Sequence, residues 1–593
     1  MEIHHKIFTV RDIMASEGLE AYIVSSNDQH LSEYVADHWK FREYLSGFTG
    51  SVGTLVILED EVGLWTDSRY FIQAEKELDP NIITLYKMGE PDVPTIEDWI
   101  VLKLEPGAKV GVDGRTFSID EIRKFNQKFK KQDIRLDTKQ FFMDEIWTAR
   151  PIIPEKDIFN QPIEYAGLSR SQKLEIIRDK MHLQGVTHYI VGALDEIAWL
   201  LNMRGNDVSF NPVFHSFLII GLDGVSLFID PHKITSKTGK ELAIDDIKVS
   251  LYEDFYKHLS ELSPYDNCVY FDPSRINSAV LSSLPQKMPK TEGMSYITTL
   301  KAIKNETEIK GVENAMIKDG LAMVEFLKWF EDNLGNTTIT ELDVVKKLKS
   351  FRSKQEGYKS ESFNTIAGYN ENGAIVHYTV NEESNTAIEP NGFLLIDSGA
   401  QYIDGTTDLT RTIYLGGLNE QAMIDYTMVL KGHIALDSTR FPKGTRGVHI
   451  DSMARQHLWK YGLNYGHGTG HGVGCFLNVH EGPQSIRPTD NGIAIEAGMI
   501  TSNEPGLYRT DEYGIRIENL VICENDQTTP FGEFYRFRTL TLCPIDLSAV
   551  KKELLNQEEK DWINNYHKKV FDQLFPQLDD DHVKWLKEKT MPL

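Results

Sequence analysis

The N-terminal half of the chain carries the same order of apolar runs twice. Each copy opens with a helical spacing of apolar residues and continues with short β-branched runs that Gly and Asp turns separate. The copies are offset by 167 residues at the start and 163 at the end, so one four-residue length change aligns them. The matching runs are residues 21–24, 54–58 and 63–67 in the first copy and 188–191, 217–220 and 226–230 in the second.

This repetition predicts two α/β domains of one design that arose by duplication, because two copies are too few for a solenoid. Chance similarity between apolar strands is the alternative explanation. The segment 149–166 contains Pro151, Pro154 and Pro162, and we interpret it as the linker between the copies.

A third unit is predicted to begin near Asn305. Asn305 and Glu308 have the spacing of a helix N-cap pair, and apolar residues then recur at near-helical spacing to about Asn333. The tail from Ser548 has a helical pattern with apolar anchors suited to packing or subunit contact: Trp562, Phe571, Leu574 and Trp585. We therefore predict a chain of α/β and α+β domains, with boundaries at residues 1–150, 151–303 and 304–593.

Composition narrows the class of protein. The 593 residues are 41% hydrophobic and 25% charged, which is ordinary for a globular protein with several domains. The formal net charge of −25 argues against binding to nucleic acid or to anionic membranes. No apolar run reaches the ~18 residues of a membrane span, and the start lacks the apolar core of a signal peptide. Four scattered cysteines without C-x-x-C spacing fit a reducing compartment.

The first chemical feature is a predicted hairpin with two aspartates. A strand-like run from Gly392 ends at Asp397, a turn signal stands at Asp404-Gly405, and Asp408 follows. In a hairpin, Asp397 and Asp408 are expected to lie roughly opposite each other, about 5 Å apart. Two carboxylates so close repel unless a cation or a proton lies between them.

A second predicted hairpin offers two glutamates. Glu504 precedes Pro505-Gly506, the chain turns around residues 511–514, and Glu518 stands at the symmetric position on the returning strand. The two hairpins together present four carboxylates, which are enough hard ligands for two divalent ions. We therefore predict a metal site, and with it a metal-dependent hydrolase.

Histidines occur in and around a glycine-rich segment between the hairpins. His467 and His471 are four residues apart, but five glycines among residues 465–474 exclude a stable helix, so an irregular loop or a strand is expected. A phosphate-binding loop is not favoured, because the P-loop sequence and a following helix are missing. His480 follows in the chain, and His377 lies earlier in a strand-like context. Each of these residues alone is more often structural than catalytic.

Together the motifs resemble the metallopeptidases of the creatinase or pita-bread fold, and among them the aminopeptidase P family. The catalytic part carries DSGAQYIDGTTDLTRT, GHGTGHGVG, NVHEGP, NEPGLY and GIRIEN in the family's order and spacing. The upstream part carries SGFTGSVG, LWTDSRYF, ALDEIAWLLNMRG and NPVFHSF. The resemblance covers nearly the whole chain and implies the long, three-domain cytosolic type, with two creatinase-type non-catalytic domains before a pita-bread catalytic domain.

The resemblance also implies a ligand set for two divalent ions. Asp397 would bind one ion, Asp408 and Glu518 would bridge both, and His471 and Glu504 would complete the second. A water or hydroxide that bridges the ions would attack the Xaa-Pro bond. The donor set, together with the family, favours Mn²⁺ over zinc or copper.

Further site residues follow from the same resemblance. Glu504 would also carry a proton to the leaving proline nitrogen, and His377, His467 and His480 would bind the substrate and stabilise the tetrahedral intermediate. Arg516 would hydrogen-bond groups around the ligands, although simple neutralisation of the carboxylates fits the sequence equally well. The family further implies a cytoplasmic homodimer that acts on peptides with proline in the second position.

Three other functions remain open on the sequence. Prolidase, which cleaves only Xaa-Pro dipeptides, shares the ligand pattern, but prolidases usually have a single N-terminal domain. Methionine aminopeptidases generally lack the paired upstream domains. A non-catalytic pita-bread binding module is disfavoured because the chain keeps all five ligand positions.

Overall fold

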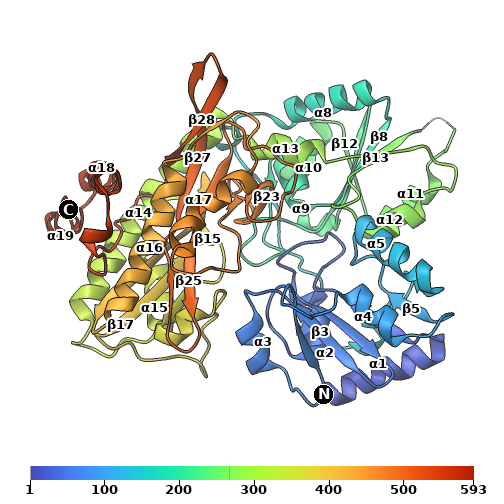
Figure 1. Cartoon of the computed structure of the whole chain (residues 1–593). Helices are drawn as coiled ribbons and strands as arrows, with labels where there is room; N and C mark the ends of the chain where they lie inside the picture. Colours follow the sequence, from blue (N-terminus) through green and yellow to red (C-terminus); the bar gives the residue numbers. More distant parts are fainter. Residues whose placement is uncertain (1, 266) are drawn as a thin grey trace. The chain divides into compact units, whose positions relative to one another are not determined.

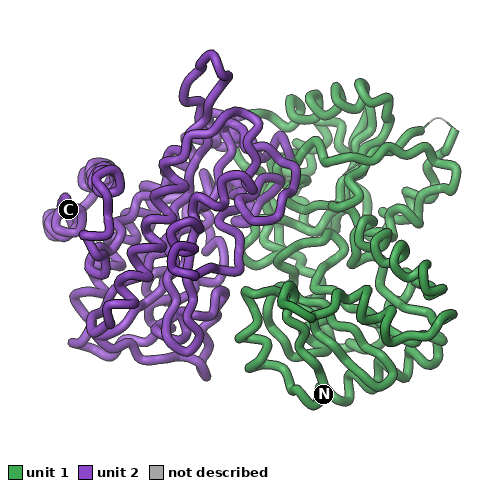
Figure 2. The backbone as a smooth tube through the Cα atoms, in the orientation of Figure 1, with its two compact units in different colours: residues 1–163, 168–298 green, residues 164–167, 299–593 purple. Residues whose placement is uncertain are grey.

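The computed structural model describes residues 2–265 and 267–593 and divides the chain into two compact units (Figure 2). Unit 1 comprises Met1–Ile163 and Leu168–Thr298, and unit 2 comprises Glu164–Gly167 and Thr299–Leu593. Among the described residues, no helix is both long enough and apolar enough to cross a membrane.

Unit 1 contains two six-stranded sheets with the same topology (Figure 1). The first has the order β4-β3-β2-β1-β5-β6 and the second β12-β11-β10-β8-β13-β14, with antiparallel pairs at the same two places in each. The first sheet consists of β1 (Ala21–Val24), β2 (Thr54–Leu58), β3 (Val62–Thr66), β4 (Thr84–Lys87), β5 (Lys109–Val112) and β6 (Arg135–Asp137). The second consists of β8 (His188–Val191), β10 (Phe217–Gly221), β11 (Val225–Phe228), β12 (Ile247–Ser250), β13 (Val269–Phe271) and β14 (Lys290–Glu292). The repeat predicted from the apolar runs is therefore confirmed.

The helix that opens each repeat ends in the same way. Helices α1 (Ile3–Glu17) and α8 (Arg170–Gln184) stop at Gly18 and Gly185, whose φ angles are 63° and 66°. This left-handed conformation costs a glycine little, and it turns the chain from the helix into the first strand of the repeat. The buried Ile7, Val10 and Met14 of α1 explain the helical spacing seen in the sequence.

A buried histidine joins the two repeats inside unit 1. His30, in the first repeat, places Nδ1 2.8 Å from the carbonyl oxygen of Gly192 and Nε2 2.9 Å from the hydroxyl of Tyr252, both in the second repeat. Burial is the main reason that the pKa of His30 falls from 6.5 to about 4. The folded protein therefore holds this imidazole neutral.

We expect unit 1 to lose stability in mild acid because of His30. The unfolded chain binds a proton below its ordinary pKa of 6.5, whereas the folded chain does so only near 4, so the free energy of unfolding falls across this range. The expected loss is about 2 kcal/mol between pH 7.5 and pH 5. Urea unfolding of His30→Gln at both values should show a weaker pH dependence than the parent protein. His232→Gln is the control, because the side chain of His232 is 91% exposed; equal pH dependence in all three proteins would contradict the assignment.

Unit 2 is built from two helix pairs that pack on antiparallel strands. Helix α14 (Glu306–Asn333) begins at Asn305, whose side chain forms a capping box with Glu308, so the predicted helix start is confirmed. It packs against α15 (Glu341–Arg352), and α16 (Glu420–Asp437) packs against α17 (Gly447–Trp459). The predicted helical tail is present as α18 (Gln557–Leu574) and α19 (Asp580–Lys589). Ile563, Val570 and Leu574 of α18 belong to the same buried apolar cluster as Ile517, which directly precedes the predicted ligand Glu518.

Candidate metal centre

The first predicted hairpin is present, with a different residue facing Asp397. Strands β17 (Gly392–Ser398) and β20 (Leu409–Gly416) pair antiparallel, and β18 (Ala400–Tyr402) and β19 (Gly405–Thr406) form the end of the hairpin. Thr410, not Asp408, stands directly across from Asp397. Asp408 lies two residues before Thr410 and hence diagonally across, a shift that the turn signal alone could not reveal. Asp397 and Asp408 are both buried.

The second predicted hairpin has the expected register. Strand β24 (Ile500–Asn503) pairs with β27 (Asn519–Thr529), and β25 (Gly506–Arg509) pairs with β26 (Tyr513–Arg516). The pairs Asn503–Asn519 and Gly506–Arg516 belong to one register, so Glu504 faces Glu518 between them. The backbone N–H groups of both glutamates donate hydrogen bonds to residues outside this hairpin. Glu504 N–H donates to Thr469 O at 2.8 Å, and Glu518 N–H donates to Thr410 O at 3.1 Å. These bonds hold the second hairpin against the glycine-rich segment and the first hairpin.

The glycine-rich segment is an irregular loop with a short strand and no helix, as predicted. Its central residues form β22 (Gly470–Gly472), which pairs with β23 (Glu481–Ile486) and with β24. A Cβ atom on Gly470 would lie 2.1 Å from the carbonyl oxygen of Ser502, so only glycine allows the strands to approach this closely. The close approach brings His471 next to the carboxylates of the two hairpins.

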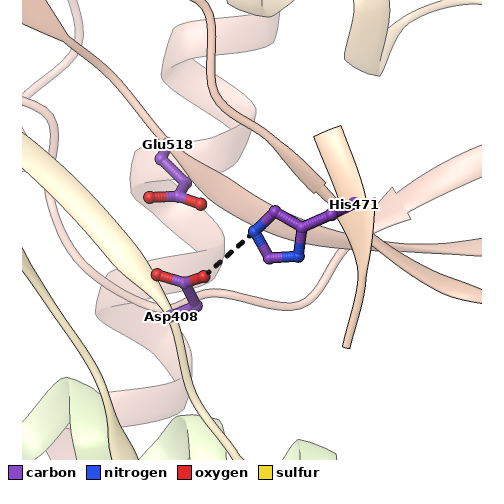
Figure 3. Close-up of side chains that lie close together, drawn as sticks. All are labelled: Asp408, His471 and Glu518. Carbon is purple, nitrogen blue, oxygen red and sulfur yellow. Dashed lines mark ion pairs between the residues drawn. The ribbon is translucent and has the colours of Figure 1, made fainter. Parts of the chain in front are cut away.

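Three of the predicted ligands form one cluster (Figure 3). Asp408, His471 and Glu518 each offer one ligand atom, and these atoms lie within 4.8 Å of one another. His471 Nε2 is 3.5 Å from Asp408 Oδ2 and 3.6 Å from Oε1 of the fourth predicted ligand, Glu504. The other ring nitrogen, Nδ1, lies 2.9 Å from Gly472 O, which fixes the tautomer that directs the Nε2 lone pair towards the cluster.

The fifth predicted ligand, Asp397, lies beside this cluster and pairs with an arginine. Asp397 Oδ2 accepts a hydrogen bond from Arg516 Nη2 at 2.6 Å. Its other oxygen, Oδ1, is buried and accepts no hydrogen bond from any described residue. An unsatisfied buried carboxylate oxygen is costly unless a cation or a proton reaches it.

The electrostatics of the cluster also call for positive charge. Burial, opposed by Arg516 and reinforced by Asp408, raises the pKa of Asp397 to about 6. Burial and the charges of Asp408 and Asp397 raise the pKa of Glu518 well above its usual value. Burial lowers the pKa of His471, but the contact with Asp408 and the charge of Glu504 outweigh it and raise that pKa to about 9. Carboxylates and an imidazole in this arrangement fit divalent cations, which would replace the protons.

The three further histidines all lie near the cluster, although the strand expected around His377 is wrong. His377 follows the 3-10 helix η5 (Asn370–Ala374), and i→i+3 hydrogen bonds at Ile375 and Tyr378 continue the turn, so local backbone bonding overrides the β-branched pattern. The ring centroids of His377 and His480 are 6.5 Å apart, and those of His471 and His480 are 4.4 Å apart. His467 Nδ1 lies 4.0 Å from Glu504 Oε2.

Sequence reasoning missed Tyr508, which connects two of the predicted residues. The Tyr508 hydroxyl accepts a hydrogen bond from Arg516 Nη1 at 2.6 Å and lies 2.8 Å from His467 Nε2. A chain of contacts thus runs from Asp397 through Arg516 and Tyr508 to His467. The tyrosine ends the NEPGLY motif four residues after Glu504, so a search for polar residues in the same motif could have found it.

Thr410 was also missed. Its hydroxyl donates to Glu518 Oε2 at 2.7 Å and also accepts from Arg516 Nε at 3.2 Å. It therefore orients a predicted ligand on the opposite hairpin. Its position in the sequence, two residues after the predicted ligand Asp408, could have indicated that it lies near the site.

Profiles of known protein families match most of the chain. The profile of metallopeptidase family M24 matches residues 310–525, and that of its C-terminal region matches residues 533–593. Two creatinase/prolidase N-terminal domain profiles match residues 6–140 and 149–308.

Relatives match at full length. The chain is 41% identical to Xaa-Pro aminopeptidase 1 of Dictyostelium discoideum, over 100% of this chain and 97% of that one. It is 39% identical to Aminopeptidase P2 of Arabidopsis thaliana, over 100% of this chain and 89% of the relative.

Solved structures agree with these matches. The X-prolyl aminopeptidase of Caenorhabditis elegans, described as a cytosolic enzyme with a di-nuclear active site, superimposes with a TM-score of 0.96 at 35% identity over 100% of both chains. The Xaa-Pro dipeptidase of Bacillus anthracis shares the fold over 64% of this chain and 99% of its own, with a TM-score of 0.51 and 22% identity. With two creatinase-type N-terminal domains and a pita-bread catalytic domain, the chain belongs to the aminopeptidase P family of M24 metallopeptidases.

Proposed function

We propose that this chain is a metal-dependent aminopeptidase that releases the N-terminal residue from peptides whose second residue is proline. The observation that carries the proposal is the cluster of Asp408, His471 and Glu518, set in a chain 41% identical over its full length to an Xaa-Pro aminopeptidase. A proline imide lacks an N–H group and resists ordinary aminopeptidases, so its cleavage needs a dedicated site. Residues 1–150 and 151–303 are assigned as the non-catalytic domains, and 304–593 as the catalytic one.

Five side chains are assigned as ligands for two divalent cations: Asp397, Asp408, His471, Glu504 and Glu518. The unsatisfied Asp397 Oδ1 and the mutual repulsion of the buried carboxylates support this assignment. Carboxylate oxygens with a single imidazole favour Mn²⁺. When bound, two such cations lower the pKa of water at the site and polarise the scissile carbonyl.

The remaining assigned residues handle protons and substrate. Glu504 would accept a proton from the attacking water and pass it to the proline nitrogen; burial raises the pKa of this carboxyl, which suits such a role. His377, His467 and His480 would donate hydrogen bonds to the substrate and to the charge that develops on its carbonyl oxygen. Arg516 would hold Asp397 in place through the 2.6 Å contact.

The competing function is prolidase, and substrate length separates the two. We expect metal-free protein to be inactive and Mn²⁺ to restore cleavage of Arg-Pro-Pro. The value of kcat/KM should be about tenfold higher or more than for Gly-Pro, because contacts to the third residue add transition-state binding. Steady-state kinetics after chelation and metal readdition measure both effects. Cleavage of the dipeptide alone would favour prolidase, and inactivity with no bound Mn²⁺ would favour a non-catalytic binding module.

The location, the oligomeric state and the class of partner complete the proposal. A cytoplasmic location is supported by the Caenorhabditis elegans protein, which is described as cytosolic, and by the scattered cysteines. A homodimer is proposed by family analogy. The net charge of −25 supports peptides, rather than nucleic acid or anionic membrane, as the partners.

A further inference from the structure

One tyrosine of helix α18, in the C-terminal tail, contacts Arg411 and Asn519, and Asn519 directly follows the predicted ligand Glu518. Tyr566 is buried, and its ring stacks on Trp562 with the centroids 5.2 Å apart. Its hydroxyl lies 2.8 Å from Cys543 O and 3.2 Å from Asn519 Oδ1, and it accepts a hydrogen bond from Arg411 Nη2 at 2.9 Å. A phenylalanine could supply the same ring packing. Burial of a hydroxyl destabilises the folded state unless its hydrogen bonds compensate for the lost contact with water.

The partner of Tyr566 is a fully buried arginine on the first ligand hairpin. Arg411 lies in β20, beside Thr410. Six neutral oxygens accept hydrogen bonds from its guanidinium: Pro544 O, Thr410 O, Glu518 O, Asn519 Oδ1, Cys543 O and the Tyr566 hydroxyl. A buried guanidinium whose bonds go to neutral groups keeps its full positive charge. That charge attracts the carboxylate of Glu518.

Arg411 joins the two ligand hairpins at the position of Glu518. Its Nη1 donates to Thr410 O at 2.8 Å on the first hairpin and to Glu518 O at 2.6 Å on the second. Thr410 in turn donates its hydroxyl hydrogen to Glu518 Oε2. The backbone and the carboxylate of Glu518 are therefore both held by neighbouring residues of β20. The Tyr566 hydroxyl accepts a hydrogen bond from the other terminal nitrogen of this guanidinium, Nη2.

We propose that Tyr566 and Arg411 are positioning residues for Glu518, and that the C-terminal extension is thereby part of the metal centre. The proposal rests on the proposed function, because it takes Glu518 as a ligand. Removal of a group that orients a metal ligand typically weakens metal binding about 10- to 100-fold. Tyr566→Phe removes only the hydroxyl and leaves the stacked ring in place.

The test is the Mn²⁺ affinity of the metal-free full-length protein, measured by calorimetric titration. We expect Tyr566→Phe to bind Mn²⁺ about tenfold more weakly than the parent protein. At saturating Mn²⁺, its KM for Arg-Pro-Pro should stay within about twofold of the parent value, because the substrate contacts are unchanged. Arg411→Lys keeps the charge but loses the fork of donors, so its affinity should fall further.

The matched control is Glu559→Gln on the same helix. Glu559 binds Lys431 Nζ of α16 at 2.6 Å and does not contact Arg411, so this change loosens the attachment of α18 away from the metal centre. Its Mn²⁺ affinity should equal that of the parent. Unchanged affinity in Tyr566→Phe, or an equal loss in Glu559→Gln, would overturn the positioning role. A parent protein that binds no Mn²⁺ would instead overturn the proposed function.

Discussion

Replacement of Asp408 by asparagine is expected to abolish Xaa-Pro hydrolysis while the fold is retained. Asp408 Oδ2 is 3.5 Å from His471 Nε2, and Asp408 belongs with Glu518 to the cluster of closely spaced ligand atoms. An amide has nearly the same shape as a carboxylate but carries no negative charge, so the proposed metal site would lose one of its anionic ligands. A loss of about 4 kcal/mol of transition-state stabilisation corresponds to a decrease in kcat/KM of about a thousandfold.

The matched control for this change is Asp404→Asn in the same hairpin. Asp404 is also buried, but its Oδ2 pairs with Lys318 Nζ at 2.7 Å and not with a predicted ligand. Metal analysis after dialysis, circular dichroism and Arg-Pro-Pro hydrolysis should be compared for both variants. Asp404→Asn should keep its metal and most of its activity. Parent-level activity and metal content in Asp408→Asn would refute the ligand assignment.

Glu504→Gln is expected to have the second largest effect, because it removes the proposed proton carrier. Glutamine can keep the 3.2 Å hydrogen bond from the Ser502 hydroxyl to Oε1, so the position of the side chain is preserved. It cannot accept a proton from water or deliver one to the leaving nitrogen. General acid–base catalysis typically contributes 10²- to 10⁴-fold, and we expect kcat to fall by about that amount.

The response to excess Mn²⁺ distinguishes proton transfer from metal loss in this variant. If Glu504 carries protons, saturating Mn²⁺ should restore metal content but not kcat in Glu504→Gln. Glu512→Gln is the control, because Glu512 is exposed in the turn of the same hairpin. Recovery of full activity by excess metal would show that Glu504 acts only as a ligand.

Local sequence signals were sufficient for the parts of the site that depend on strand periodicity and turns. The turn around residues 511–514 placed Glu504 opposite Glu518, and the glycines around His471 excluded a helix. The same reasoning placed Asp408 roughly opposite Asp397, whereas the direct partner of Asp397 is Thr410. A hairpin with a second, shorter ladder at its end has a register that turn residues alone do not specify.

Contacts between distant segments could not be predicted in this way. Arg411 and Tyr566 are 155 residues apart, and nothing near either residue indicates that they meet. Tyr508 meets Arg516 within its own hairpin, but it contacts His467 only because the glycine-rich segment packs on that hairpin. Polar contacts of this kind depend on tertiary packing, which periodicity and turn chemistry do not encode.

The ladder that runs on both sides of Glu504 and Glu518 has a consequence for sequence variation. On the side away from the turn, four residue pairs from Ile500–Ile522 to Asn503–Asn519 fix the alignment of the two strands. An insertion or deletion at residues 510–512 would be absorbed in the exposed loop, because a one-residue slip would have to break that alignment and reverse every buried side chain. The spacing of the two glutamates is therefore insulated from changes at the tip, and loop length there can drift without altering the chemistry.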